Sequence, residues 1–474
     1  MMRVLLLLVL CVPARAFALG EVSPILFLNR CTNNCTVNGG VDDARAMSSS
    51  IPCAAGASCG GGSCSCNGTS AGTYTVEEFK NYMGQTGAAA DEEWNMIVQC
   101  VREVYSPYNI AVTDVFPTGM AHTQGIVAGL PVNIGYGGLN TGGLGGTSSC
   151  EPVDNVISFT FANIFTSTSQ QARVRTLCYV VAQETGHSFG LDHAFEFSDG
   201  RSACTDPMSY RNDCGGQRFF RNDLARCGEN GPRPCKCPNL QNSHQKLLAI
   251  FGPGMPLTGP PTLTVSSPTD GATIQNGTPV IATAFAQRGV HHIDLLLNGY
   301  KWLTVKGAPF GGNGQPETTY PLVLPSGVPD GIIDIVVKAY DDIDAETDAT
   351  LTVTKGAPCT TADTCAKGQK CDAGKCFWEP PVGELGDPCT YDQFCKTGSC
   401  VETTSGQFCS NVCVVGVDDS CGTGFTCEGA AGGNGYCVPV GAGDDTCCGI
   451  GANGKTSALL SLFVVGFVLR RKRR

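Results

Sequence analysis

The spacing of the cysteines constrains this chain more than any other feature of its sequence. The 474 residues include 29 cysteines, too many to stay reduced in a cytosol, so we expect disulfides formed outside it. Without Cys11 and the adjacent pair Cys447–Cys448, 26 cysteines remain, of which 14 lie in Cys31–Cys237 and 12 in Cys359–Cys437. This even division predicts two separate disulfide sets.

The N-terminus has the features of a secretory signal. Arg3 precedes the apolar run Val4–Val12, and small residues suited to signal peptidase cleavage follow at 14–18. We predict a signal peptide over residues 1–18 and an exported protein. The net charge of −11, with no basic stripe in the body of the chain, argues against a nucleic-acid partner.

The C-terminus ends in a short apolar run, Ser457–Leu469, followed by the basic run Arg470–Arg474. At 1.5 Å per residue the apolar run is short for a bilayer core of ~30 Å. With Cys447–Cys448 and a Gly-rich spacer before it, the tail resembles the Myxo-CTERM sorting tag of myxobacterial surface proteins. The resemblance implies that residues 446–474 are a tag with a short transmembrane helix. A sorting protease would remove it near that cysteine pair, leaving the body at the cell surface or outer membrane. A plain membrane anchor is the alternative.

Strand and helix patterns mix between Pro24 and Gly252. The Gly-rich stretch Gly135–Gly146 does not lie between a strand and a helix start, as a phosphate-binding loop must, so we expect a flexible surface loop there. Hydrophobic periodicity predicts strands at Ile25–Leu28, Asn109–Val115 and Val156–Phe161, and helices at Asp91–Tyr105 (with Asp91 as N-cap) and Gln170–Phe189. The stretch Gln241–Phe251 fits a further, C-terminal helix.

The pattern changes after the linker Pro260–Pro261. About seven short alternating strands follow between Leu263 and Lys355, which resembles bacterial Ig-like domains and implies an all-β Ig-like sandwich over 260–356. Further on, Pro-Cys-x5-Cys recurs at Pro358 and Pro388 with little apolar periodicity. Segments this short bury too little core on their own, so residues 358–440 are expected to form a disulfide-stapled stalk.

The stretch VAQETGHSFGLDH, residues 181–193, carries the candidate chemistry. Positions i and i+4 of a helix share a face, so Gln183 and His187 are expected to point the same way, with Glu184 beside them. Gly190 allows a left-handed turn that ends the helix. The turn is expected to bring His193 back toward the same face.

This pattern resembles the metzincin zinc peptidases (matrixin- or astacin-like), whose motif is H-E-x-x-H-x-x-G-x-x-H followed by a methionine turn. Here the motif is Q-E-T-G-H-S-F-G-L-D-H, with DPMSY after it. The resemblance implies an α+β catalytic domain over residues 21–252, with a twisted sheet, an active-site helix and a Met-turn. It also implies Zn²⁺ bound by Gln183, His187 and His193, Glu184 as general base, Met208 under the metal, and Tyr210 as a ligand or transition-state stabiliser.

Gln183 stands where the family has its first histidine ligand. A neutral amide oxygen is a poorer donor to Zn²⁺ than imidazole, so zinc is expected to bind weakly or not at all without compensation. Gln183 Oε1, a fuller bond from Tyr210, or Asp192 swinging in can each compensate. Asp192 can also be the acceptor for a histidine N–H.

Three functions therefore remain open, the third of which is a structural component of the cell envelope. The first is a secreted, cell-surface zinc endopeptidase that hydrolyses extracellular proteins by Glu-assisted attack of a metal-activated water. The alternative is a catalytically inactive metzincin-like binding or adhesion protein of the cell surface, whose metal site is weakened by Gln183.

Overall fold

The structure, a computed structural model, describes most of the chain between residues 22 and 440. Within that range it leaves out residues 54–56, 61–62, 67–69, 138–140, 147–149, 168, 311–313, 325–326, 404–405, 416–420 and 430–433. The predicted signal peptide (1–18) and C-terminal tag (446–474) lie outside the described residues. None of the helices in the described part is long and apolar enough to cross a membrane.

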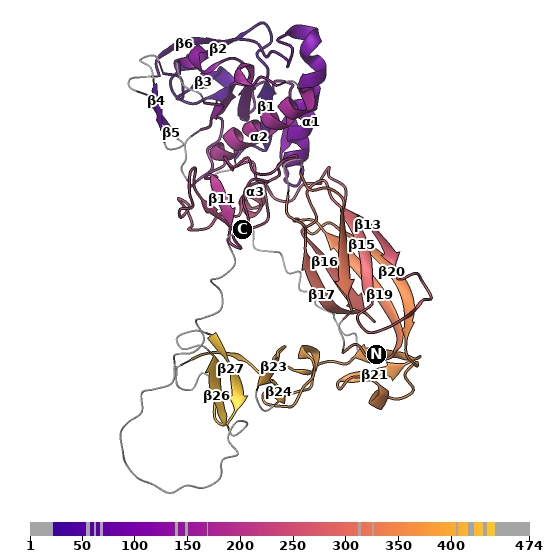
Figure 1. The fold of residues 1–474 in the computed structure, drawn as a ribbon. Helices are drawn as coiled ribbons and strands as arrows, with labels where there is room; N and C mark the ends of the chain where they lie inside the picture. The colour runs from indigo at the N-terminus through magenta and orange to yellow at the C-terminus, as the bar shows by residue number, and fades with distance from the viewer. Residues whose placement is uncertain are drawn as a thin grey trace, which may run out of the picture. The chain divides into compact units, whose positions relative to one another are not determined.

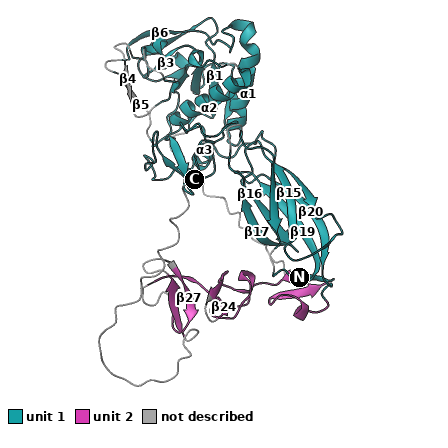
Figure 2. Ribbon diagram, viewed as in Figure 1, with its two compact units in different colours: residues 1–359, 373–375 teal, residues 360–372, 376–474 magenta. Residues whose placement is uncertain are grey.

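Contacts divide the chain into two compact units, coloured separately in Figure 2. Unit 1 is Met1–Cys359 with Ala373–Lys375, and unit 2 is Thr360–Asp372 with Cys376–Arg474. The described residues are mostly β-structure with few helices and many disulfides.

A five-stranded sheet forms the centre of the N-terminal part of unit 1 (Figure 1). The first four strands in its order are parallel, and the last is antiparallel to its neighbour. Strands β8 and β10, the third and fourth in this order, are buried along their whole length, as expected for a sheet covered on both faces. The order is β7 (Ala111–Thr113), β1 (Ile25–Asn29), β8 (Thr123–Val127), β10 (Ile157–Thr160) and β9 (Gly143–Leu144).

Two long helices, α1 (Asp91–Tyr105) and α2 (Gln170–Ser188), pack against this sheet and against each other. The disulfide Cys100–Cys178 joins them covalently, and the buried ion pair of Glu93 and Arg173 joins them electrostatically. The same part of the chain also contains β2 (Cys35–Gly39), β3 (Ser48–Ser49), β4 (Ala57–Gly60), β5 (Ser63–Cys66), β6 (Gly72–Val76), β11 (Ala194–Phe197), β12 (Ala225–Cys227) and α3 (Ser243–Phe251).

The three predicted strands and three predicted helices of this part are confirmed; α1 has the predicted bounds, and the other five elements have shifted ends. The prediction that Asp91 is the N-cap of α1 is wrong. Asp91 is the first residue of the helix, and its N-cap is Ala90, which ends a 3-10 turn. The expectation of a flexible loop over Gly135–Gly146 is wrong for Gly143–Leu144, because these residues form the edge strand β9.

The second part of unit 1 is a sandwich of two sheets around one apolar core. All seven predicted strands are present, and β14 is added to them. In β19 every second residue is buried, so one face lines the core. One sheet is β13 (Thr262–Ser267), β15 (Pro279–Phe285) and β18 (Thr318–Val323); the other is β14 (Thr273–Ile274), β20 (Glu346–Lys355), β19 (Gly331–Tyr340), β16 (His292–Leu297) and β17 (Tyr300–Lys306).

A buried ionic cluster lies beside this sandwich core. Arg288 binds Asp342 through two hydrogen bonds, Nε–Oδ1 at 2.8 Å and Nη2–Oδ2 at 3.0 Å. Arg221 lies 3.4 Å from the same carboxylate, and all three side chains are buried. Asp342 is therefore the carboxylate that pairs with both guanidinium groups.

Unit 2 consists of short hairpins held by disulfides. Its strands are β21 (Gln369–Asp372), β22 (Lys375–Trp378, whose first residue belongs to unit 1), β23 (Cys400–Thr403), β24 (Gly406–Cys409), β25 (Val412–Val414), β26 (Phe425–Gly429) and β27 (Asn434–Pro439). Each disulfide that the structure describes joins two cysteines of the same predicted set, so the division into two sets is confirmed among these residues.

Candidate functional site

The C-terminal half of helix α2 places the first three residues of the candidate site. The helix begins at a Ser169 cap, whose hydroxyl accepts from the Ala172 N–H, and continues to Ser188. Gln183 and Glu184 are buried, and His187 is partly buried one turn after Gln183. As predicted from their spacing, Gln183 and His187 lie on one face of the helix.

The turn after the helix brings His193 to His187. Gly190 has φ +78°, and a Cβ atom there would lie 2.5 Å from the Cys150 carbonyl oxygen, so the position requires glycine on two grounds. His187 Nε2 and His193 Nε2 then lie 3.0 Å apart. The predicted histidine pair is therefore brought together.

Both rings present an unprotonated nitrogen at this meeting point. His187 Nδ1 bonds the Leu191 carbonyl oxygen at 2.8 Å, and His193 Nδ1 bonds Glu229 Oε1 at 2.9 Å. Since those partners accept, each Nδ1 is the donor and each neutral ring leaves its Nε2 as a lone pair. Burial, and then the neighbouring His193, lowers the pKa of His187 to about 3, so that ring is neutral. The two Nε2 lone pairs repel each other when nothing lies between them. A metal cation bound by both nitrogens would remove this repulsion.

Gln183 has an unsatisfied group at the same site. Its Nε2 is buried and has no hydrogen-bond partner in the structure. An unpaired buried amide is costly, so it calls for an explanation. Since a half-turn of the terminal amide exchanges its oxygen and nitrogen, the side chain can present Oε1 instead. The donor set of one amide and two imidazoles therefore fits Zn²⁺, with weaker donation at Gln183 than a third histidine would give.

Glu184 lies under the edge strand β9. Burial raises the pKa of its carboxyl group to about 8, although a hydrogen bond from the Gly145 backbone N–H acts in the opposite direction. Cβ atoms at Gly143 and Gly145 would lie 2.5 Å from Glu184 Cγ and Glu184 O, respectively. Both glycines therefore make room for the helix. We did not single them out from the sequence, where the run of glycines around them was the available signal.

Replacing Gly145 with alanine is expected to disturb this packing. The new Cβ would lie 2.5 Å from Glu184 O and 2.8 Å from His187 Cβ, so β9 or the helix must shift. Overpacking of this kind costs about 1–3 kcal/mol, which calorimetric unfolding can measure. Gly137→Ala is the control, because its Cβ would meet Val132 at an ordinary 3.4 Å. Equal stability of the two variants would contradict the assigned packing.

The methionine and tyrosine after the motif also reach the site. Met208 is fully buried, its carbonyl accepts from the Ala194 N–H, and its Sδ lies 2.7 Å from where a Cβ of Gly186 would be. Met208 is therefore packed directly against the last turn of α2. The Tyr210 ring lies 4.4 Å from the His193 ring, centroid to centroid. Partial burial and the nearby Glu184 and Glu229 carboxylates raise the pKa of the Tyr210 hydroxyl.

Asp192 has neither of the two roles predicted for it, a compensating metal ligand or the acceptor for a histidine ring N–H. Its carboxylate accepts from Arg233, from the Lys236 backbone N–H and from the His193 backbone N–H, and among the described residues it makes no hydrogen bond with either histidine ring. The acceptor for His193 Nδ1 is Glu229. Sequence reasoning missed Glu229, because it lies in a cysteine-rich stretch with no local pattern linking it to the motif.

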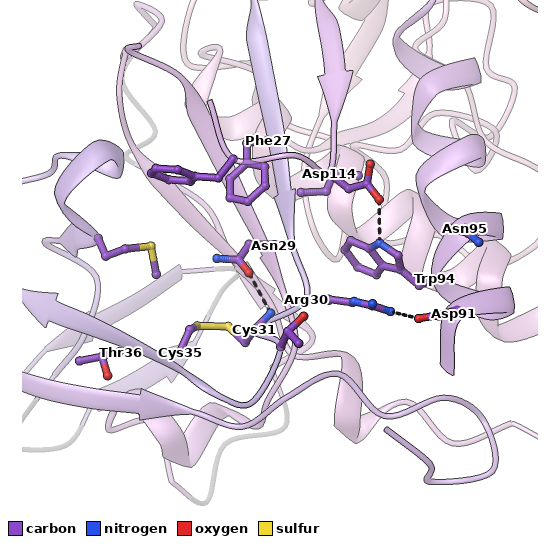
Figure 3. A pocket seen from close by; sticks show the side chains of 14 residues that line it. Phe27, Asn29, Arg30, Cys31, Cys35, Thr36, Asp91, Trp94, Asn95 and Asp114 are labelled. Carbon is purple, nitrogen blue, oxygen red and sulfur yellow. Dashed lines mark hydrogen bonds and ion pairs between the residues drawn. A yellow bond between two sulfur atoms is a disulfide. The ribbon is translucent and has the colours of Figure 1, made fainter. Parts of the chain in front are cut away.

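A separate pocket of about 670 Å³ lies where strands β1 and β7 end and helix α1 begins (Figure 3). Its charged groups are paired, since Arg30 bonds Asp91 at 2.5 Å and Asp114 accepts from the Trp94 indole at 3.2 Å. None of the predicted site residues lines it.

Comparisons with known proteins give little further information. No protein-family model matches the chain, and no curated protein matches it. Among solved structures, the fibronectin(III)-like modules of Clostridium thermocellum CbhA are 24% identical over 20% of this chain and 47% of that chain, with a TM-score of 0.16. OgpA from Akkermansia muciniphila is 12% identical over 49% of this chain and 64% of that chain, with a TM-score of 0.15. Beta-glucuronidase 3 of Bacteroides uniformis is 14% identical over 50% of this chain and 26% of that chain, with a TM-score of 0.14. The chain thus spans less than two thirds of each of these structures.

Proposed function

We propose that this protein is a secreted, cell-surface zinc endopeptidase of the metzincin type. Zn²⁺ would be held by His187, His193 and, through its amide oxygen, Gln183. The observation that carries the proposal is the 3.0 Å approach of two histidine Nε2 atoms whose Nδ1 atoms are both committed to acceptors. The order of the five-stranded sheet, the Gly190 turn and the packing of Met208 against Gly186 support a metzincin-like domain.

The protein's own groups have distinct tasks in this reaction. Bound zinc supplies a Lewis acid that acidifies a water molecule. Glu184 accepts the proton of that water at its carboxylate and passes it to the leaving amine. Tyr210, whose ring lies 4.4 Å from the His193 ring, would donate a hydrogen bond to the developing oxyanion. The outer edge of β9 offers backbone groups to an extended peptide substrate.

The rest of the chain supports display outside the cell. Disulfides throughout both cysteine sets suit an oxidising compartment. In this proposal the Ig-like sandwich (260–356) and the stapled stalk (358–440) carry the peptidase domain (21–252) away from the surface, and its substrates are extracellular proteins or peptides. The C-terminal tag and its sorting protease remain predictions from the sequence.

Zinc content and casein cleavage of the full chain test this proposal. We expect near-stoichiometric zinc by elemental analysis, and cleavage that falls by at least about 100-fold in Glu184→Gln while zinc is retained. Gln183→His is expected to bind zinc more tightly, because imidazole replaces a neutral amide oxygen.

The alternative function predicts a different result. A wild-type protein that is metal-free and inert, with Gln183→His gaining both zinc and cleavage, would make it an inactive binding or adhesion protein. If neither protein binds zinc, the metal site itself is wrong.

A further inference from the structure

A loop closed by its own disulfide lies against the second histidine. Cys227 and Cys235 are bonded, and their segment folds back so that the N–H of Cys227 bonds the Arg233 carbonyl at 2.9 Å. The next N–H, of Gly228, bonds the carbonyl of His193 itself at 2.9 Å. The loop is therefore fixed to the backbone of the candidate ligand.

From this loop Glu229 reaches the His193 ring. Its Oε1 accepts from His193 Nδ1 at 2.9 Å, and the histidine is 5% exposed. Arg233 holds the carboxylate in place, donating to the same Oε1 at 2.8 Å and to both oxygens of Asp192 at 2.6 and 2.8 Å. Asp192, His193 and Glu229 also lie within 4.8 Å of one another. The Arg233 guanidinium already provides the cation between these carboxylates, so we assign no second metal there.

We propose that Glu229 is the positioning residue for His193, and that the loop Cys227–Cys235 serves to hold it there. This inference rests on the proposed function. A carboxylate on the far nitrogen fixes the tautomer and orientation of a metal-binding imidazole and makes it a stronger donor. The corresponding nitrogen of His187, Nδ1, bonds only the neutral backbone carbonyl of Leu191. The charged partner on His193 therefore offsets the weak donation of Gln183.

The test is the affinity of the full chain for Zn²⁺, measured by competition with a chromophoric chelator. We expect Glu229→Ala to weaken zinc binding by about 10–100-fold. Glu229→Gln is expected to weaken it less, because the amide oxygen still accepts from Nδ1 but carries no charge. The visible spectrum of the Co²⁺-loaded protein should also change, more in Glu229→Ala than in Glu229→Gln. Glu196→Gln is the matched control, since this carboxylate pairs with Arg226 on the adjoining strands β11 and β12 and does not bond His193.

The outcomes separate the two proposals. If the wild type binds zinc and both Glu229 variants bind within about twofold of it, with an unchanged Co²⁺ spectrum, the positioning role is overturned and the proposed function stands. If the wild type binds no zinc, both are overturned. A merely structural role would lower the melting temperature of Glu229→Gln without changing its zinc affinity, and that result also overturns the inference.

Discussion

Replacement of Arg173 by methionine is expected to destabilise the N-terminal part of unit 1 by about 3–5 kcal/mol, because it breaks a buried ion pair and leaves one charge behind. Among the described residues, Glu93, which is 1% exposed, would keep only the Tyr82 backbone N–H as a donor. Arg173 also donates to three backbone carbonyls that lose this donor, those of Phe165, Lys80 and Ala162. Arg173 therefore joins α1, α2 and the loops around them.

Calorimetry of the full chain can measure this effect, and a fall of roughly 6–20 °C in melting temperature is expected for a part of this size. Arg175→Met, the same change two residues further along α2 at an exposed position, should cost less than about 0.5 kcal/mol. Adding Glu93→Gln to Arg173→Met should recover part of the loss, because it removes the stranded charge. A single variant as stable as the Arg175 control would show that the ion pair is not buried as described.

The second large effect is expected from Asp342→Asn. Burial alone would raise the pKa of Asp342, but the charges of Arg288 and Arg221 outweigh it, and the pKa lies well below its usual range. Arg288 Nη1 and Arg221 Nη2 already lack hydrogen-bond partners in the structure. Without the carboxylate, both buried guanidinium groups would lose their compensating charge. We expect a loss of about 3–5 kcal/mol.

The pH dependence provides an independent check on Asp342. A depressed pKa in the folded state stabilises the protein fully above the unfolded value of about 3.9, and this stabilisation is lost as pH falls below it. The difference between wild type and Asp342→Asn should therefore be constant at neutral pH and shrink below about pH 4. Asp344→Asn, at an exposed position in the same turn, should match the wild type throughout. A difference between wild type and Asp342→Asn that stays constant to pH 2 would contradict the argument.

Much of the fold follows from local patterns, and the exceptions have physical reasons. Helix α1 and the strands of the sandwich were predicted, because their apolar residues recur at periods set by the backbone. Strand β8, TQGIV, was missed because it is buried on both faces and does not alternate. Strand β9 was missed because it contains glycine where a strand usually has a larger side chain. The glycine is required there because Glu184 of helix α2 occupies the space that a Cβ atom would need, and no local sequence pattern shows this.

The same distinction holds at the candidate site. The meeting of His187 and His193 was predicted from helix geometry and a glycine turn, both of which act over a few residues. Glu229 lies 36 residues beyond His193 and reaches it through a disulfide-closed loop, so only the tertiary structure identifies it. Whether Gln183 binds zinc depends on donor strength, which neither spacing nor fold determines.

The arrangement of the disulfides divides the protein by its response to a reductant. No cysteine lies between Cys237 and Cys359, so the sandwich between them is held without a disulfide, by its apolar core and by the ion pair of Arg288 with Asp342. Thiols should therefore loosen the two ends of the chain and leave the middle folded. A protease added under reducing conditions would release an intact central fragment. Export into a compartment that fails to oxidise the chain would leave the sandwich folded and the two cysteine-containing ends unfolded.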